Sequence, residues 1–332
     1  MLNICKPKVS VITPIYNVEN YIERCIRSLF EQTLDNIEYI FVNDCTPDRS
    51  MEVIQKILKQ YPEREKQVHI IDHPYNMGAA KSREDGIKAA NGEYIIHCDS
   101  DDWVDTDMYM LMYDKAKKEN LEMVICDWYE TDGTNHTPIK QNIDASADML
   151  RGLISRSISG SLCNRLVAKH LYMKITEFPQ AHMMEDVNYS IQLTIKCNKR
   201  LGIIDKPLYY YFHNNQSICH LPGDKSCIER CKQACINIDH IIRILESHNL
   251  CDYYDREIVV LKNYARVFIW HLYMRKPRKY RKLWRSIYPE INNKYPFTTG
   301  IGIKLRIIFF LANIGVYPYL LRFMKQIKSA FK

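Results

Sequence analysis

Short apolar runs alternate with stretches of helical periodicity between residues 9 and 98. The runs are continuous rather than alternating with polar positions, which is typical of parallel strands covered on both faces. The runs predicted as strands are Val9–Thr13, Glu38–Val42, Val68–Asp72 and Glu93–Cys98. The stretches predicted as helices are Asn20–Gln32, Arg49–Gln60 and Ala79–Ala90. The pattern therefore predicts an α/β domain with a mostly parallel central sheet flanked by helices.

The later pattern predicts a mixed region followed by helices alone. A helix from Trp103 to Asn120 and a strand at Met123–Asp127 precede a polar segment, Tyr129–Asp144, expected as a loop or hairpin over the site. Ala145–Ser157 is predicted to be helical. The helices expected after Ser226 are Cys227–Ser247, Tyr253–Met274 and Ile301–Phe331. We expect a domain of residues 1–217 and a helical extension of residues 218–332.

Positive charge is concentrated at the C-terminal end. The net charge is +7, but residues 270–332 hold 14 Lys/Arg and one acid, so that segment is +13 and the remainder −6. The apolar stretch Ile307–Leu321 is flanked by cations and is too short to span a membrane comfortably. We expect this extension to lie on an anionic membrane surface, with Tyr317 and Tyr319 at headgroup level. A helix packed in a core is the alternative.

The cysteines and the N-terminus indicate a cytoplasmic protein. The 12 cysteines show no regular framework, and many lie in apolar or helical runs, which favours free thiols in a reducing compartment. Cys227, Cys231 and Cys235 share one stripe of a helix, which is more typical of packing than of a metal site. The first residues do not resemble a signal peptide. The expected location is the cytoplasm, with peripheral contact to the inner face of the membrane.

Three carboxylates follow the fourth predicted strand, in the segment Asp99-Ser-Asp-Asp102. Carboxylates so close repel one another unless a cation or solvent compensates them. Oxygen ligands without Cys or paired His favour Mg²⁺ or Mn²⁺. The alternative is a helix N-terminal cap, with Asp102 preceding Trp103.

The order and spacing of several short segments resemble family 2 glycosyltransferases of the GT-A fold. The resemblance spans about Pro7 to Ser217. It rests on Val9–Asn17, Tyr21–Leu29, Ile40–Asp44, Asn76–Gly78, Gly92–Ile95 and Asp99–Asp102. The family implies a Rossmann-like GT-A domain with nucleotide-sugar binding in residues 1–102 and the acceptor side in residues 103–217.

The resemblance also implies roles on the nucleotide side. Asp44 resembles the acceptor of the uracil N3–H, although a turn residue capping the next helix is the alternative. Asp101 resembles the ligand of Mn²⁺ or Mg²⁺. The other implied nucleotide-side residues are Pro14, Ile15 and Tyr16 under the base, Glu19 at the base or ribose, Arg83 at the diphosphate or base edge, and Asp99 at the ribose.

On the acceptor side, the resemblance points to Glu185-Asp186 at the start of a predicted helix. Asp186 resembles the general base of an inverting transfer, and Glu185 would orient the acceptor or the base. A charged first helical turn is the alternative. Arg165 stands where the family has Lys, and Ser217 lies in the segment that closes near the diphosphate. His213 is a candidate for the diphosphate or the metal, although a lone His is more often a packing residue.

We therefore expect an inverting transferase that moves a sugar from a UDP-sugar to a hydroxyl of a glycan or lipid-linked acceptor, in the synthesis of cell-surface polysaccharide or glycolipid. A sugar-nucleotide pyrophosphorylase would need a glycine-rich loop after the first strand, and an oxidoreductase a G-x-G-x-x-G there; both are absent. No nucleic-acid recognition motif accompanies the basic segment. A non-catalytic nucleotide-sugar-binding scaffold at the membrane is the remaining alternative.

Overall fold

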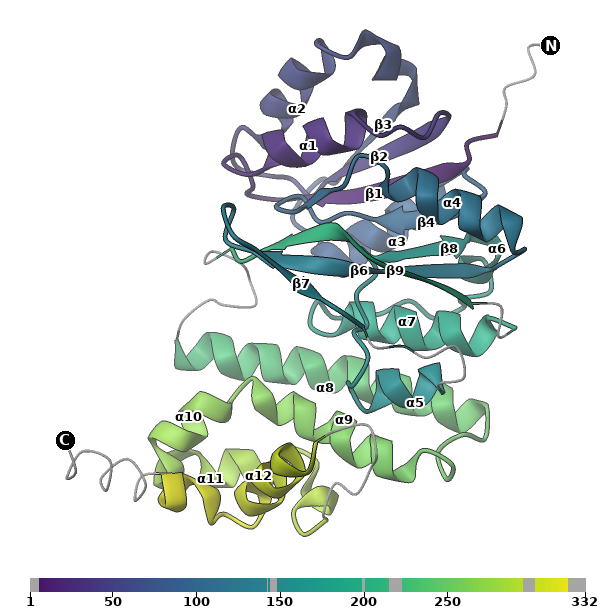
Figure 1. The fold of residues 1–332 in the computed structure, drawn as a ribbon. Coiled ribbons are helices and arrows are strands. Elements are labelled where there is room, and N and C mark those ends of the chain that lie inside the picture. The colour runs from purple at the N-terminus through teal and green to yellow at the C-terminus, as the bar shows by residue number, and fades with distance from the viewer. Residues whose placement is uncertain are drawn as a thin grey trace. The chain divides into compact units, whose positions relative to one another are not determined.

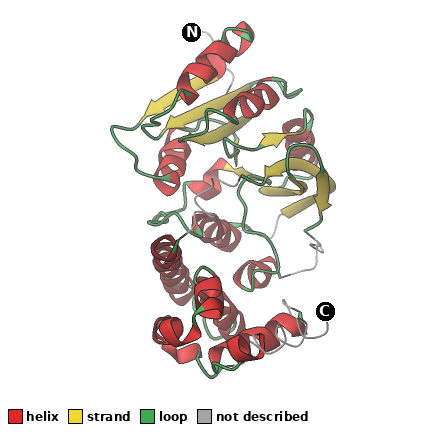
Figure 2. Cartoon of the chain, turned by 90° about the vertical axis from the view of Figure 1, so that its left-hand side faces the viewer, coloured by secondary structure: helices red, strands yellow, loops and turns green. Residues whose placement is uncertain are grey.

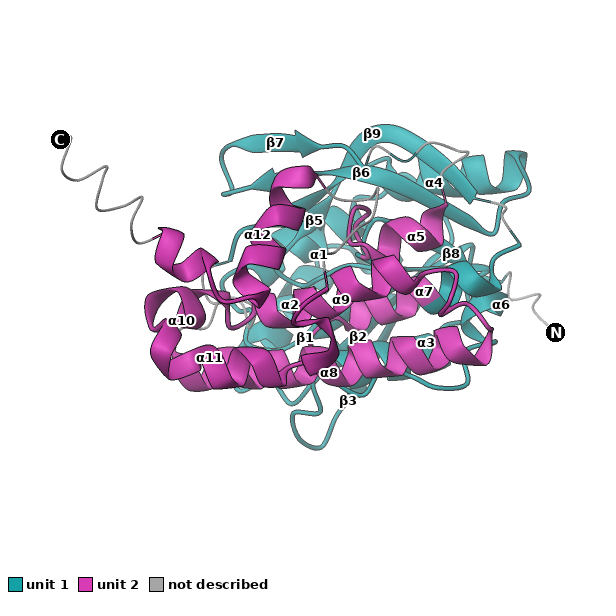
Figure 3. Ribbon diagram, turned by 90° about the horizontal axis from the view of Figure 1, so that it is seen from below, with its two compact units in different colours: residues 1–147, 161–182, 192–215 teal, residues 148–160, 183–191, 216–332 magenta. Residues whose placement is uncertain are grey.

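The computed structural model describes residues 6–141, 143, 148–198, 201–214, 223–294 and 302–321 (Figure 1). The chain forms two compact units (Figure 3). Unit 1 comprises residues 1–147, 161–182 and 192–215, and unit 2 comprises residues 148–160, 183–191 and 216–332. Two short segments of the range expected for the catalytic domain, residues 148–160 and 183–191, therefore belong to unit 2. The functional division at residue 217 stays a prediction.

Unit 1 is built on a nine-stranded mixed sheet in the order β3-β2-β1-β4-β8-β6-β9-β5, with β7 paired to β6. Strands β1 to β4 are parallel neighbours, as the continuous apolar runs predict, whereas β8 pairs antiparallel with both β4 and β6. The strands are β1 Val9–Ile15, β2 Ile37–Asn43, β3 Val68–Asp72, β4 Tyr94–His97, β5 Trp103–Val104, β6 Met123–Thr131, β7 His136–Ile139, β8 Arg165–Ala168 and β9 Leu201–Phe212.

Helices cover both faces of the parallel part of the sheet (Figure 2). On one face, α1 (Ile22–Phe30), α2 (Ser50–Leu58) and α4 (Met108–Lys118) share a core with alternate residues of β1 and β2. On the other face, α3 (Ala79–Ala89) lies so close that a Cβ on Gly86 would fall 2.4 Å from Ile12 Cγ2. This double coverage explains why β1, β2 and β4 are buried along nearly their whole length and are largely apolar, with Ser10, Thr13, Glu38 and His97 as buried polar exceptions. The unit also contains η1 (Pro62–Gln67) and α6 (Lys169–Tyr172).

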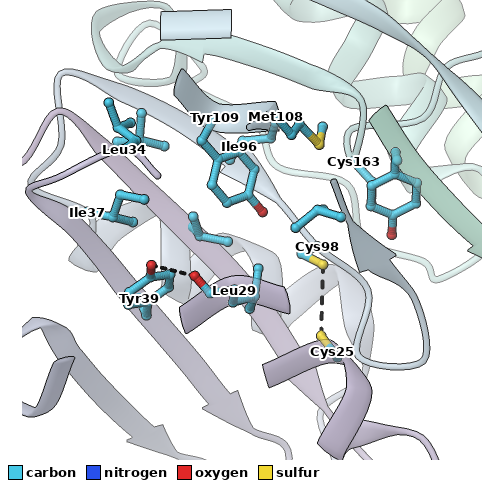
Figure 4. Packing of buried hydrophobic residues seen from close by; sticks show 14 of the residues in the cluster. Cys25, Leu29, Leu34, Ile37, Tyr39, Ile96, Cys98, Met108, Tyr109 and Cys163 are labelled. Carbon is cyan, nitrogen blue, oxygen red and sulfur yellow. Dashed lines mark hydrogen bonds between the residues drawn. The ribbon is translucent and has the colours of Figure 1, made fainter. Parts of the chain in front are cut away.

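The core under α1 contains polar atoms that are paired within it (Figure 4). Tyr39, fully buried on β2, donates its hydroxyl to the carbonyl of Leu29 at 2.6 Å, so burial of the ring leaves no orphaned donor. Cys25 and Cys98 approach with their Sγ atoms 3.9 Å apart as free thiols. The hydrogen bond with Cys25, and after it burial, raises the pKa of the Cys98 thiol, which suits a packed rather than a reactive cysteine.

Unit 2 is helical. Its core packs Tyr273 against Trp284, with ring centroids 4.7 Å apart, and buries Arg266, whose guanidinium donates to Asn313 and to the carbonyl of Ile287. In the described part of the chain, no helix has the length and apolar character needed to cross a membrane. The helices are α5 Met149–Ile154, α8 Asp224–Ser247, α9 Asp255–Val267, α10 Trp270–Arg275, α11 Pro277–Ser286, η3 Pro289–Ile291 and α12 Ile303–Asn313, together with the first part of α7 Glu185–Lys196.

The secondary-structure predictions for residues 9 to 98 are confirmed to within a few residues at each end. The segment expected as a loop or hairpin forms one, since β7 pairs with β6 through Trp128↔Ile139. Three predictions do not match the structure. The helix expected over Ile301–Phe331 is interrupted, because α12 ends at Asn313 and a turn follows at residues 314–315. Tyr253–Met274 is divided between α9 and α10, and the helix after Trp103 begins only at Met108 because Trp103–Val104 pairs with β9.

Candidate active site

The carboxyl ends of β1, β2 and β4 meet at one edge of the sheet, where parallel α/β sheets bind ligands. The polar residues predicted for the nucleotide side follow these ends. The segment at the end of β1 differs from expectation, because Pro14 and Ile15 still pair with β2 and Ile15 is fully buried. Tyr16, the next residue, is exposed and is thus the member of this predicted group that can stack on a base.

Asp44, directly after β2, organises the turn before α3. Its carboxylate accepts hydrogen bonds from the backbone N–H of Met77 and of Gly78, both at 2.7 Å. His73 Nδ1 lies 2.8 Å from the same carboxylate, and His73 Nε2 lies 3.1 Å from Asp85. Asp44 therefore ties the turn to β2 and β3 from a buried position. Its predicted contact with uracil stays a prediction.

His73 was missed by the sequence analysis, although its position carried a signal. It follows β3 immediately and so lies at the same sheet edge as the residues after β1, β2 and β4.

Glu19, predicted to contact the base or ribose, forms an ion pair with Arg49 in which Glu19 Oε1 and Arg49 Nη2 lie 2.5 Å apart. The hydrogen bond from Arg49 lowers the pKa of Glu19.

Arg83 and Asp99 form an ion pair in the structure. Arg83 lies on α3, is buried, and donates from Nη2 to Asp99 Oδ1 at 2.7 Å. A guanidinium at this position offsets one negative charge of the acidic loop. The pair joins two of the residues that the family resemblance places beside the nucleotide.

Asp102 connects the acidic loop to strand β9. It is buried, accepts a hydrogen bond from the Tyr209 hydroxyl, and accepts another from the Phe212 N–H at 2.7 Å. The Tyr209 hydroxyl in turn accepts from the Asp99 N–H at 3.2 Å. Burial, followed by the charges of Asp101 and Asp99, raises the pKa of Asp102. The alternative of a helix cap is wrong, because Asp102 precedes strand β5 and fastens β9 instead.

Asp101 differs from Asp99 and Asp102 in its surroundings, and its role as a metal ligand stays a prediction. It is half-buried and accepts a hydrogen bond from Asn214 Nδ2 at 3.0 Å. Burial, and after it the charge of Asp99, raises the pKa of Asp101, and the hydrogen bond from Asn214 opposes this change. Among the residues that the structure describes, no three His, Cys, Asp or Glu side chains are grouped to hold a metal ion.

Arg24, on α1, contacts the loop that carries Asp101, and it was not among the site residues predicted from the sequence. Its guanidinium lies 3.4 Å from the ring centroid of Trp103 and 4.7 Å from that of Phe212. It donates from Nη2 to the Asp101 carbonyl at 3.3 Å. Burial lowers the pKa of Arg24, while the charges of Asp102 and Asp101 oppose that change. The stack lines a surface hollow of about 820 Å³.

The contacts of the remaining predicted site residues give less information about their roles. His213 Nε2 lies 3.5 Å from Glu130, and its role at a metal stays a prediction. Arg165 is fully buried in β8 and donates from Nε to the Ser161 carbonyl at 2.9 Å, so its guanidinium faces protein in this structure. Ser217 lies outside the described residues.

Glu185 and Asp186 open α7 in unit 2. Asp186 is half-buried, and its Oδ1 accepts from the Val187 N–H at 2.7 Å; Glu185 is buried. Met184 precedes them with φ 67°, a left-handed conformation that is uncommon outside glycine and often marks functional positions. That these carboxylates meet the nucleotide side of unit 1 stays a prediction.

Comparison with known proteins decides the family. The model for glycosyl transferase family 2 matches residues 10–175, which is half of the 332-residue chain. The chain belongs to glycosyl transferase family 2. The described site residues at the carboxyl ends of β1, β2 and β4 all lie within this match, whereas Glu185 and Asp186 follow it.

Relatives and solved structures agree with this membership. The chain is 32% identical over 226 residues to the uncharacterized glycosyltransferase EpsJ of Bacillus subtilis, covering 65% of this chain and 64% of EpsJ. It is 37% identical over 232 residues to the uncharacterized glycosyltransferase YibD of Escherichia coli, covering 66% of each. These alignments therefore span slightly less than two thirds of either relative.

The crystal structure of residues 1–349 of S. aureus TarS in complex with UDP-GlcNAc superposes on this chain with a TM-score of 0.69 at 18% identity, covering 96% of this chain and 92% of that one. This likeness confirms the GT-A fold.

Proposed function

We propose that this protein is a metal-dependent, inverting glycosyltransferase that uses a UDP-sugar. The observation that carries the proposal is the differing surroundings of the three carboxylates at the end of β4. Asp99 is ion-paired with Arg83, and Asp102 is fastened to β9. Asp101 is half-buried and accepts a hydrogen bond from Asn214 but has neither of these two engagements, which suits a cation ligand. A UDP donor is supported by TarS, a protein of the same fold that was solved with UDP-GlcNAc.

The proposed donor site uses residues at the carboxyl end of the sheet. Tyr16 would stack on the base, Asp44 would accept the uracil N3–H, and Arg83 with Asp99 would hold the ribose and diphosphate side. Asp101 would hold Mn²⁺ or Mg²⁺, with the diphosphate and water supplying other oxygen ligands. A cation there would offset the negative charge that develops on the departing diphosphate.

The proposed reaction is a single displacement. The acceptor oxygen forms a bond to the anomeric carbon while the bond between that carbon and the diphosphate oxygen breaks, so the electron pair leaves with UDP. Asp186 takes the proton of the acceptor hydroxyl, and Glu185 orients the hydroxyl or the base. We propose a glycan or lipid-linked acceptor in cell-surface polysaccharide or glycolipid synthesis.

Turnover with purified protein tests this proposal. UDP-, GDP- and dTDP-sugars would be incubated with Mn²⁺, with and without a chelator, and nucleotide release would be measured together with donor binding by calorimetry. We expect one UDP-sugar to bind and to release UDP in a chelator-sensitive manner. Asp101→Asn should abolish the metal-dependent part of donor binding. The matched control Asp114→Asn changes an exposed carboxylate on α4 and should leave binding unchanged.

The general base is tested separately. Asp186→Asn should bind the donor normally but lose turnover, while Asp252→Asn, an exposed carboxylate in the same unit, should retain it. Donor binding by the wild type without turnover, even when acceptor glycolipids are supplied, would favour the scaffold alternative. Absence of binding to every nucleotide sugar would refute the proposal.

A further inference from the structure

Helices α10 and α11 of unit 2 present a strongly basic face. Helix α11 buries Pro277, Tyr280 and Trp284 on one side. Its other side and the end of α10 carry exposed cations: Arg275, Lys276, Arg278, Lys279, Arg281 and Lys282. Asp224 lies 3.5 Å from both Arg275 and Lys279 and so offsets part of this charge. An excess of positive charge remains.

Helix α12 and the residues after it present exposed apolar side chains. One side of α12 is buried through Phe309, Ala312 and Asn313. Its other side exposes Ile303 and Ile307, which lie one helical turn apart, with 65% and 44% of their surface accessible. Val316, Tyr319 and Leu320 are also more than one-third exposed. Water therefore contacts large apolar side chains on a helix whose opposite side is already packed.

The C-terminal end of α12 lies beside the basic helices α10 and α11. A Cβ on Gly315, next to Val316, would lie 3.6 Å from Arg281 Nη2, and Arg285 donates to the Asn313 carbonyl at 3.3 Å. The Tyr317 ring lies 5.6 Å from that of Trp270 at the start of α10. The C-terminal end of α12 is thus fixed beside α10 and α11, as the neighbouring ribbons in Figure 1 show. We call the six exposed cations with Ile303, Ile307, Val316, Tyr319 and Leu320 the C-terminal surface.

We propose that the C-terminal surface binds an anionic lipid membrane. Cations adjacent to exposed aliphatic and aromatic side chains match a bilayer surface, where lipid phosphates meet the cations and the apolar groups enter the acyl boundary. Tyr319 suits this depth because its ring is apolar and its hydroxyl polar. A nucleic acid would satisfy the cations but leave the aliphatic side chains in water. This inference goes beyond the proposed transfer reaction and does not depend on it.

Vesicle flotation with the full chain tests the proposal. Vesicles of phosphatidylcholine would be compared with vesicles that also contain phosphatidylglycerol. The charge variant Lys276→Gln/Arg278→Gln/Lys282→Gln should lose about a hundredfold in affinity for the anionic vesicles, because each of the three cations near such a surface contributes about fivefold. The matched control Lys56→Gln/Lys59→Gln/Lys66→Gln removes three exposed lysines of unit 1 and should bind as the wild type does.

The apolar half of the surface needs its own variant, Ile307→Ser/Leu320→Ser. We expect it to bind anionic vesicles several-fold more weakly than the wild type, since the side chains that would insert are removed. Failure of the wild type to bind anionic vesicles would overturn the proposal, and so would an equal loss in the lysine control. Wild-type affinity of the apolar variant, with full competition by a single-stranded oligonucleotide, would show a general polyanion site instead. Donor binding in lipid-free solution should be equal in all variants, so failure of the transferase proposal remains distinguishable.

Discussion

Asp101 and Asp102 are adjacent in the chain, yet their surroundings predict opposite consequences of mutation. Asp102 is buried and accepts hydrogen bonds from the Tyr209 hydroxyl and the Phe212 N–H. Asp101 is half-buried and accepts one from Asn214. We predict that replacing Asp102 by Ala destabilises the fold, and that replacing Asp101 by Ala instead removes metal-dependent donor binding.

The size of the difference follows from the contacts. Asp102→Ala leaves two buried donors without their acceptor, at about 1–3 kcal/mol each. Removing a buried carboxylate near Asp99 and Asp101 also relieves repulsion, so we expect a net loss of about 2–4 kcal/mol. Asp102→Asn keeps an acceptor for Phe212 and should cost about 1 kcal/mol. Asp101→Ala should stay within about 1 kcal/mol of the wild type, because its carboxylate is partly solvated.

Urea unfolding measures these differences. Circular dichroism reports the whole chain, and tryptophan fluorescence adds a second probe, with Trp103 and Trp128 in unit 1 and Trp270 and Trp284 in unit 2. Calorimetry with Mn²⁺ and the UDP-sugar measures binding in the same samples. Equal destabilisation by Asp101→Ala and Asp102→Ala would refute the assignment of separate roles. A complete loss of metal-dependent binding in the well-folded Asp102→Asn variant would also refute it.

Three further predictions concern the same sheet edge. Gly78→Ala should lower the free energy of unfolding by about 1–3 kcal/mol, because Gly78 has φ 85° and the new Cβ would fall 1.7 Å from His182 Cε1. Adding His182→Ala to this variant should restore part of the thermal midpoint. No restoration would contradict the predicted clash. Arg24→Met should weaken Mn²⁺ binding several-fold by freeing the Asp101 carbonyl, and Arg24→Lys should not restore it because the planar stack on Trp103 is lost; a calorimetric affinity equal to that of the wild type would exclude this positioning role. The affinity for Mn²⁺ should fall on acidification from a higher pH than at an ordinary aspartate, because the pKa of Asp101 is raised and its proton competes with the cation; without metal, the same shift means that stability declines as the pH rises through the window above the ordinary value of 3.8.

Much of the parallel sheet could be predicted because its strands bear a local signal. Val9–Ile15 and Ile37–Asn43 are apolar at nearly every position since α1 covers one face and α3 the other. In the far half of the sheet, the local pattern predicted β6 and its hairpin with β7 but not the way in which the strands pair. Strand β8 has four residues and is antiparallel to its neighbours, and β9 pairs with β6 through a register shift near Asp127. Such pairings depend on contacts between distant segments, which a local pattern does not encode.

The acidic loop shows most clearly where sequence reasoning stops. Three carboxylates within four residues imply that their charges must be offset, and the sequence predicted a cation for that reason. In the structure, two of the carboxylates have partners within the protein. Arg83 forms an ion pair with Asp99, and Asp102 accepts a hydrogen bond from Tyr209, 107 positions away in the chain. Neither partner could be assigned by spacing alone, because each comes from another element. Asp101 is therefore the carboxylate of the cluster that we expect to need a cation, and a single substitution of Asp101 is a sharper test than removal of all three charges.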